Sequence, residues 1–287
     1  MKNRRNISVT ICIKKYYPVV LEIVESFVNQ TLSPSDIVIV GELHALNKIK
    51  KKFEKEKNIT YESFIGDKNV ARNKSISLAK GDYVIFSDYD MVASLNLLEE
   101  CSKLLGKHNA LVIPEVGTNS RNFFKRVFKL EKEIANDDND AITPRMFKKN
   151  LFDDGSKPFD VKFGVLDEWG FYKNLKKKKP SVGYVKNAFF TIKDRFSFSE
   201  RLDRSYKKGF WSNYLIKDMG MEGVKRINPI NRGLIVYSRN FKLFINNPFI
   251  FLTLIAIKNI EFLSFAVGYF VGSIQRISLK DIENNTA

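Results

Sequence analysis

Apolar and polar positions follow two different periods along the first part of the chain. Ser8–Ile13, Asp36–Val40 and Tyr83–Ser87 are short apolar runs with the length and composition of buried strands. Between them, Val19–Val28 and Val70–Ala79 carry apolar residues three or four positions apart, as an amphipathic helix does. Strands that alternate with helices predict an α/β fold, in which a mixed, mostly parallel sheet is flanked by helices.

The pattern is less regular beyond residue 115. Asn119–Ile134 predicts a helix, and a polar loop over residues 136–140 follows it. Val182–Val185 and Ala188–Ile192 have the spacing of a β pair. Ser199–Lys217 predicts a basic helix with an aromatic face, interrupted by a glycine.

The carboxyl-terminal part contains two apolar runs without a charge, Leu243–Ile257 and Phe262–Ile274. Each run is shorter than the roughly 20 residues that a membrane-crossing helix needs. Lys258 and Glu261 separate the runs, so the pattern favours a re-entrant or interfacial hairpin, with its charges at the headgroups. A pair of core helices is the alternative interpretation.

Composition narrows the partners and the compartment. Lys and Arg number 48 against 32 Asp and Glu, which gives a formal net charge of +16 and favours an anionic membrane surface, nucleic acid or phosphorylated substrates. Cys12 and Cys101 are the only cysteines, so a disulfide framework is excluded and a reducing compartment is expected. No clean apolar stretch of signal-peptide type follows the basic amino terminus, which favours the cytoplasm.

Two acids at the end of the strand Tyr83–Ser87 are the strongest chemical signal. Asp88 and Asp90 stand two positions apart, so their side chains point the same way if the chain is extended. Ligands of parallel sheets bind outside the carboxyl ends of the strands. Carboxylates suit Mg²⁺ or Mn²⁺, and Mg²⁺ is commonly shared with substrate phosphates. A polar turn explains the same residues, so the pair alone does not decide between a turn and a metal site.

Four segments, in chain order, resemble family 2 glycosyltransferases of the GT-A, Rossmann-like fold. They are the opening strand–helix–strand from Ser8 to Val40, the run Ala71-Arg72-Asn73 with Gly81-Asp82, the acidic motif Asp88-Tyr89-Asp90, and Asp167-Glu168-Trp169. The resemblance covers roughly residues 7–220. It implies a GT-A catalytic domain over residues 1–220, followed by a hydrophobic, membrane-associating helical segment over residues 221–287.

The resemblance implies an inverting, metal-dependent transfer of a sugar from a UDP- or GDP-sugar to a hydroxyl of a glycan or lipid-linked acceptor. Asp88 and Asp90 are implied to hold Mg²⁺ or Mn²⁺, with Asp90 as the more direct ligand and Asp88 facing the donor. Glu168 is implied as the general base that deprotonates the acceptor, and Asp167 is the alternative.

Further roles follow from the same resemblance. Donor binding is implied for Arg72, Asn73, Asp88, Glu42, Lys207 and Lys208. Acceptor binding is implied for Arg145 and Trp169. Glu115, Glu131 and Arg145 also look like a subgroup that acts on polyprenyl-phosphate-linked acceptors, which implies a location at the inner face of the cell membrane.

The chain departs from the family pattern at several positions. Ser75 stands where the family has glycine, and Glu168 where it usually has aspartate. Two other functions remain open: a nucleotidyltransferase on a similar fold, and a non-enzymatic basic protein that binds membranes or nucleic acid. Nucleic acid is not expected as a partner, because the acids at 88, 90, 167 and 168 repel phosphates unless a metal is bound.

Overall fold

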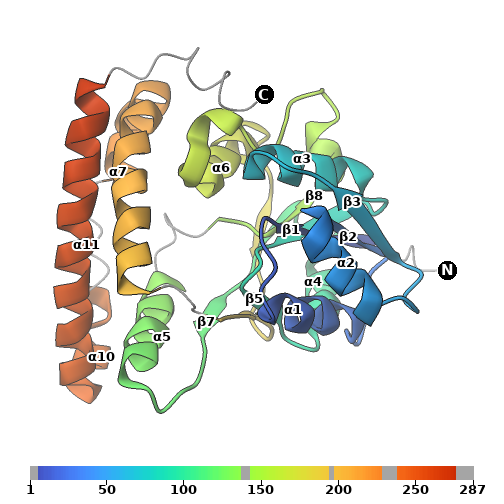
Figure 1. The fold of residues 1–287 in the computed structure, drawn as a ribbon, viewed down its shortest axis with the longest axis horizontal. Coiled ribbons are helices and arrows are strands. Elements are labelled where there is room, and N and C mark those ends of the chain that lie inside the picture. The colour runs from blue at the N-terminus through green and yellow to red at the C-terminus, as the bar shows by residue number, and fades with distance from the viewer. Residues whose placement is uncertain (1–5, 137–142, 194–196, 228–237, 276–287) are drawn as a thin grey trace. The chain divides into compact units, whose positions relative to one another are not determined.

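A computed structural model describes residues 6–136, 143–193, 197–227 and 238–275 of the chain (Figure 1). The chain folds into two compact units, which the following text calls the sheet unit and the helical unit. The sheet unit consists of Met1–Glu115, Thr143–Val161 and Glu168–Lys193, and the helical unit of Val116–Ile142, Lys162–Asp167 and Asp194–Ala287. The expected polar loop lies outside the described residues after Asn136.

The sheet unit is built on a seven-stranded sheet in the order β3-β2-β1-β4-β8-β6-β9. Its strands are β1 (Ile7–Ile13), β2 (Asp36–Gly41), β3 (Ile59–Ser63), β4 (Tyr83–Ser87), β6 (Ala110–Val112), β8 (Met146–Lys148) and β9 (Val182–Tyr184). β8 is antiparallel to both of its neighbours, and the other neighbouring strands are parallel. The expected mixed, mostly parallel sheet is therefore confirmed.

Helices cover both faces of this sheet (Figure 1). They are α1 (Val19–Val28), α2 (Leu43–Lys52), α3 (Lys68–Leu78), α4 (Leu97–Leu104) and α6 (Asp167–Lys177), with short 3₁₀ turns at Lys149–Phe152 and Val161–Leu166. Side chains of β1 alternate between the faces, because successive residues of a strand point in opposite directions. Ile11 packs with residues of α1, α2 and α4, and Cys12 packs with residues of α3 and α6.

A second, smaller sheet follows the order β5-β10-β7, in which β5 (Met91–Ala93) is antiparallel to β10 (Phe190–Ile192). β7 (Glu115–Gly117) is where the chain leaves the sheet unit. The predicted pairing of Val182–Val185 with Ala188–Ile192 is wrong. β9 instead joins β6 in the large sheet, and β10 joins β5 in the small one. The connection between them is anchored by Val185 and Ala188, both buried in the core, so the chain is carried between sheets rather than folded back on itself.

The helical unit contains α5 (Phe123–Asn136), α7 (Phe198–Met219), α8 (Met221–Ile227), α10 (Phe241–Asn246) and α11 (Pro248–Ile274). The predicted hairpin of two apolar runs is wrong, because α11 continues without a break from Pro248, inside the first run, through Lys258 and Glu261 to the end of the second run at Ile274. Lys258 and Glu261 are three residues apart and therefore share one face of the helix. They do not mark a turn at the headgroups, since both form ion pairs with Glu131 of α5 or Arg201 of α7.

Glycines allow α7 and α11 to pack closely. A Cβ atom added to Gly209 of α7 would lie 2.0 Å from the carbonyl oxygen of Phe265, and one added to Gly268 of α11 would lie 2.0 Å from that of Tyr206. The predicted interruption of α7 at Gly209 is wrong, because the helix runs through this residue. This packing groups α7 with the carboxyl-terminal helices, whereas the expected boundary at residue 220 separated them.

Candidate active site

The carboxylate of Asp88, directly after β4, is surrounded by cations of the sheet unit. Arg72 donates from Nη2 to Oδ1 at 2.5 Å, and the ammonium of Lys68 lies 3.0 Å from the same oxygen. Arg145 donates from Nη1 to Oδ2 at 3.4 Å. Burial alone would raise the pKa of Asp88, but the charges of Arg72, Lys68 and Arg145 outweigh it and hold this pKa well below its usual value. Asp88 is therefore a fixed negative charge at neutral pH.

Arg72 is held rigidly beneath this carboxylate. Its side chain is only 2% exposed, and its guanidinium lies over the rings of Phe86 (5.5 Å) and Phe159 (4.8 Å). Contacts of a guanidinium with ring faces add a modest electrostatic attraction and fix its plane. Arg72 thus holds Asp88 in position, and its contact with the donor stays a prediction.

Asn73 stabilises the neighbouring loop. Its Nδ2 donates to the carbonyl oxygen of Phe159 at 2.6 Å, and its Oδ1 accepts from the backbone N–H of Phe159 at 3.0 Å. Both ends of the amide are therefore used to hold the backbone beside the ring that packs on Arg72. These contacts give Asn73 a supporting role in the site.

Arg145, just before β8, joins three carboxylates from different parts of the sheet unit. It donates from Nη2 to Glu115 and to Glu168, each at 2.8 Å, in addition to its bond to Asp88. Burial alone would lower its pKa, but Glu168, Glu115 and Asp88 together raise it well above the usual value. The guanidinium is a permanent cation whose fork-shaped set of donors suits this bridging position.

The two predicted base candidates lie side by side in sequence but differ in surroundings. Glu168 is the second residue of α6, and its side chain is 37% exposed while it binds Arg145. Asp167 is buried and belongs to the helical unit. Trp169, the predicted acceptor contact, is partly buried on the next position of α6. Glu168 is thus the candidate that the structure joins to Asp88, through Arg145.

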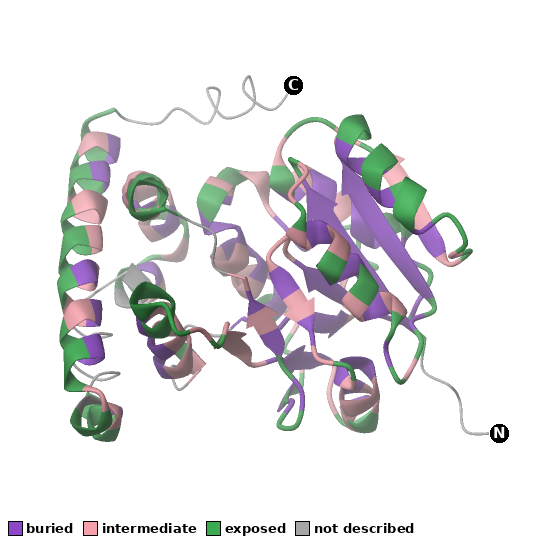
Figure 2. Cartoon of the chain, turned by 60° about the horizontal axis from the view of Figure 1, so that its bottom comes forward, coloured by how far each residue is buried: buried purple, intermediate pink, exposed green. Residues whose placement is uncertain are grey.

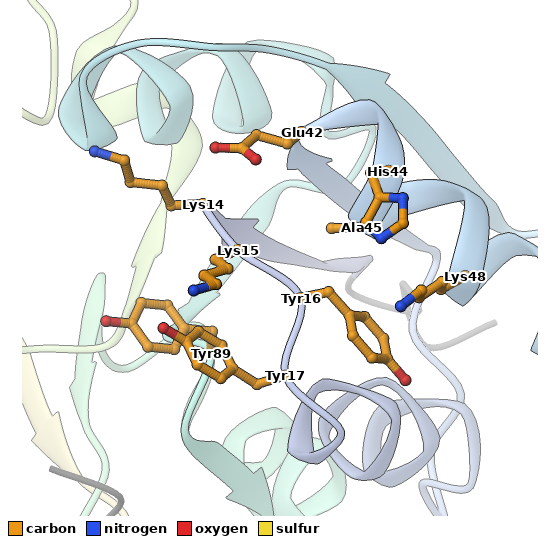
Figure 3. Close-up of a pocket in the computed structure, with 9 residues that line it drawn as sticks. All are labelled: Lys14, Lys15, Tyr16, Tyr17, Glu42, His44, Ala45, Lys48 and Tyr89. Carbon is orange, nitrogen blue, oxygen red and sulfur yellow. The ribbon is translucent and has the colours of Figure 1, made fainter.

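The sheet unit contains a pocket of about 630 Å³ (Figure 3). One of its lining residues, Tyr89, directly follows Asp88 in the chain. Its lining residues come from the loop after β1, the start of α2 and the acidic motif: Lys14, Lys15, Tyr16, Tyr17, Glu42, His44, Ala45, Lys48 and Tyr89. β2, β1 and β4 are neighbours in the sheet, so the pocket forms outside their carboxyl ends. Tyr89, between Asp88 and Asp90, contributes directly to it.

The pocket combines positive charge with aromatic rings. The rings of Tyr17 and Tyr89 are stacked, with centroids 6.1 Å apart, and the ammonium of Lys48 lies 4.5 Å from the centroid of Tyr16. Lysines suit phosphate groups, and aromatic faces suit a planar base. Glu42, predicted to contact the donor, lines this pocket.

Asp88 and Asp90 differ as possible metal ligands. Both oxygens of Asp88 already pair with cations, so a metal would have to compete with Lys68, Arg72 and Arg145 for this carboxylate. Asp90 is partly exposed, and its carbonyl oxygen accepts a bond from Lys193 N at 2.8 Å, which fixes its backbone. Among the described residues, no group of three or more His, Cys, Asp or Glu could hold an ion. Mg²⁺ commonly binds through one or two carboxylates together with substrate phosphates, so Asp90 fits a metal that is bound with a diphosphate.

Lys207 and Lys208, also predicted to bind the donor, lie in the other unit. Both are exposed on α7, and Lys207 forms an ion pair with Asp203 at 2.6 Å. The cations that contact Asp88 are Lys68, Arg72 and Arg145, so the predicted donor contacts of Lys207 and Lys208 stay predictions.

The sequence pattern did not lead us to predict Lys68, or the lysines and tyrosines after β1, as residues of the site. Lys68 precedes Arg72 by four residues, one turn along the same helical face, and this spacing was a usable signal. Lys14, Lys15, Tyr16 and Tyr17 follow the carboxyl end of the first strand, where ligands of such sheets bind. Their position in the chain was enough to nominate them.

A mostly parallel sheet with an acidic motif after β4, beside a basic and aromatic pocket, is the arrangement that the resemblance to GT-A glycosyltransferases implied. The family model described as "Glycosyl transferase family 2" matches residues 8–170. The chain therefore belongs to glycosyl transferase family 2.

The chain is similar in sequence to the poly(ribitol-phosphate) beta-glucosyltransferase of Bacillus spizizenii. It is 26% identical over 208 residues, which cover 65% of this chain and 32% of the relative. The chain thus spans about a third of the length of this relative.

The fold of this chain is similar to those of several solved structures. The S. aureus TarS structure gives a TM-score of 0.53 at 16% identity, over 74% of this chain and 40% of that one. Residues 1–349 of TarS in complex with UDP-GlcNAc give a TM-score of 0.52 at 16% identity, over 72% and 66% of the two chains. The mannosyltransferase PcManGT of Pyrobaculum calidifontis, in complex with GDP-Man and Mn²⁺, gives 0.60 at 12% identity, over 94% and 88%.

Proposed function

We propose that this chain transfers a sugar from a UDP- or GDP-sugar to a hydroxyl of a glycan or lipid-linked acceptor, with inversion at the sugar carbon. The observation that carries the proposal is the fixed carboxylate of Asp88, held by Arg72, Lys68 and Arg145. Tyr89 links this carboxylate to a pocket with the charge and the rings that a nucleotide needs. The named sugar donors in complexes of similar fold, UDP-GlcNAc and GDP-Man, support the same class of donor.

The pocket accounts for donor binding. Lys14, Lys15 and Lys48 attract the diphosphate, and the tyrosines offer faces for the base. Asp88 accepts hydrogen bonds from hydroxyls of the donor, because a carboxylate that stays ionised remains an acceptor. Asp90 would hold Mg²⁺ or Mn²⁺, which supplies charge stabilisation to the departing nucleoside diphosphate.

Glu168 accounts for acceptor activation. An inverting transfer needs a base within hydrogen-bond reach of the attacking hydroxyl, on the side of the sugar opposite the leaving group. The side chain of Glu168 is 37% exposed, while Arg145 binds its Oε1 atom and thereby restricts its direction. Asp167 is buried and is the second choice. The word "beta" in the name of the Bacillus relative agrees with inversion of an α-linked donor.

For the acceptor, we propose a chemical class. A net charge of +16 favours an anionic acceptor, such as a glycan that carries phosphate or a glycan linked to polyprenyl phosphate. Poly(ribitol-phosphate), which the name of the Bacillus relative specifies, belongs to this chemical class. Arg145 and Trp169 are proposed on the acceptor side of the site, and the reaction is proposed at the cytoplasmic face of the cell membrane.

The proposal is tested by turnover of a panel of UDP-Glc, UDP-GlcNAc and GDP-Man, each with Mg²⁺ or Mn²⁺ and with poly(ribitol phosphate). Phosphorus NMR identifies the released product, and proton NMR the anomeric configuration of the new bond. We expect a nucleoside diphosphate and a β-linked product. Release of pyrophosphate would instead assign a nucleotidyltransferase, and calorimetry without binding of any donor in the presence of metal would reject the proposal.

A further inference from the structure

The outward face of α11 is apolar along the whole helix. One set of its exposed positions recurs every three or four residues, which places these residues in one stripe. They are Phe249, Leu252, Ala256, Ile260, Leu263, Val267, Phe270 and Ile274. Phe249 is 79% exposed and Phe270 is 66% exposed. In Figure 2, exposed segments recur along one side of α11 and buried segments along the other.

The two charged residues of α11 lie on the opposite side and are used inside the helical unit. Lys258 forms ion pairs with Glu131 and, at 2.7 Å, with Glu261. Arg201 of α7 closes the cluster, since it lies 2.7 Å from Glu131 and 2.8 Å from Glu261. The four side chains balance one another in charge.

This arrangement is the reverse of an ordinary surface helix. A helix on the surface of a water-soluble protein turns its charges outward and its apolar stripe inward. α11 also buries Ile250, Leu254 and Ile257 against α5, so it has an apolar face on each side. An exposed apolar surface of this length marks a docking face for a membrane or a partner.

We propose that this stripe is the surface by which the protein docks onto an anionic phospholipid bilayer, with the axis of α11 in the plane of the interface. The net charge of the chain, +16, is complementary to anionic headgroups. The same charge makes two copies of the chain repel each other, which disfavours a dimer. Phe241 and Ile245 of α10, 57% and 63% exposed, carry apolar side chains beside the exposed Lys242. Apolar side chains beside a basic one suit the boundary between headgroups and acyl chains.

α7 explains why α11 lies on the bilayer although its length and composition are sufficient to cross one. The glycine contacts bring the backbone of α7 directly against α11. α7 presents Arg204, Lys207 and Lys208 to solvent. A transmembrane α11 would carry these charges into hydrocarbon, where each costs roughly 2.5 kcal/mol or more. Contact through the outward stripe leaves them in water.

The test is co-sedimentation of the full chain with vesicles of phosphatidylcholine, with and without one-third phosphatidylglycerol. The double variant Leu263→Glu/Phe270→Glu removes apolar contact at two strongly exposed positions, so we expect its partition coefficient to fall at least about tenfold. Ile65→Glu in the sheet unit is the matched control, because Ile65 is 84% exposed outside the stripe, and we expect it to bind as the unaltered chain does. Thermal unfolding of all three proteins checks that the fold is unchanged.

Two results would overturn the proposal. One is unchanged vesicle binding of the double variant. The other is an unaltered chain that does not bind vesicles but sediments as a dimer, with the double variant monomeric, which would make a second copy the occupant. The measurement contains neither donor nor acceptor, so its outcome is independent of the proposed sugar transfer.

Discussion

The Nη2 atom of Arg145 lies 2.8 Å from Oε1 of Glu168, and the Nη1 atom of the same guanidinium lies 3.4 Å from Oδ2 of Asp88. One cation thus connects the carboxylate proposed to orient the donor with the carboxylate proposed to deprotonate the acceptor. Because the guanidinium is planar and rigid, the two carboxylates cannot rotate independently. This connection makes the relative placement of donor and acceptor sensitive to a single side chain.

Arg145→Lys is expected to distinguish the effect of the positive charge at this position from the effect of its hydrogen-bond geometry. Lysine keeps the positive charge but, as a point charge, does not reproduce the fork-shaped bridge to Asp88, Glu115 and Glu168. We expect kcat to fall by about 10²-fold with a smaller change in the donor KM, because misplacement of reacting groups by about 1 Å costs this much. Steady-state kinetics measure the effect, with the exposed Arg121→Lys as control. A purely structural role would lower the unfolding temperature without this split between kcat and KM.

Glu168→Gln is expected to remove the general base. The amide is nearly isosteric and cannot accept a proton, so kcat should fall by about 10²- to 10⁴-fold. Donor binding by calorimetry should persist, because the pocket and Asp88 are untouched. Asp167→Asn provides the comparison, and a larger loss in that variant than in Glu168→Gln would transfer the role of base to Asp167.

Asp90→Asn is expected to weaken metal activation. An amide oxygen is a poorer ligand than a carboxylate, so the Mn²⁺ concentration for half-maximal donor turnover should rise by about tenfold or more. Asp88→Asn should differ, since it leaves Arg72, Lys68 and Arg145 without their shared carboxylate and should lower thermal stability and donor affinity. Equal activation by Mn²⁺ in Asp90→Asn and the unaltered chain would remove Asp90 from the metal site.

Local periodicity predicted most of the sheet unit. α1 and β4 have the predicted bounds, because their apolar patterns are strong and their ends carry clear signals. The location of Asp88 at the end of β4 followed from the same pattern. Its partners on α3 and before β8 did not, since the salt bridges depend on how distant segments come together in the fold.

The helical unit was harder to predict for a related reason. Lys258 and Glu261 break an apolar pattern in sequence, and a break in that pattern predicts a turn. Their partners, Glu131 and Arg201, lie more than fifty residues away and satisfy both charges inside a continuous helix. Gly209 had the same ambiguity, because a glycine that weakens a helix locally also permits close packing of two helices. Tertiary contacts decided both cases.

Glu131→Gln is expected to change the acid stability of the helical unit. Burial would raise the pKa of Glu131, but Lys258 and Arg201 outweigh it and lower the pKa to about 2 from the usual 4.5. A lowered pKa in the folded state gives stability that is present above pH 4.5 and is lost as pH falls towards about 2. Glu131→Gln should therefore be less stable at neutral pH, by about 3 kcal/mol, and should lose less further stability on acidification.

The matched control for this variant is Glu133→Gln on the same helix. Glu133 is 40% exposed and lies 3.7 Å from Lys129, so its pair should contribute little. Urea unfolding of the three proteins between pH 6 and pH 3 measures the difference. Parallel pH profiles for the unaltered chain and Glu131→Gln would contradict a stabilising role for the partly buried ion-pair cluster of Glu131, Arg201, Lys258 and Glu261.

Gly268→Ala is expected to destabilise the contact between α7 and α11. The added methyl would lie 2.0 Å from the carbonyl oxygen of Tyr206, which is backbone and cannot move aside cheaply. Overpacking costs about 1–3 kcal/mol or more, against a gain of up to about 1 kcal/mol in helix propensity, so the net change should be a loss. Gly272→Ala, whose methyl would lie 2.5 Å from the carbonyl oxygen of Phe210, should lose less. Urea unfolding gives the order, with the exposed Val267→Ala as control, and a stabilised Gly268→Ala would show that the two helices do not pack this closely.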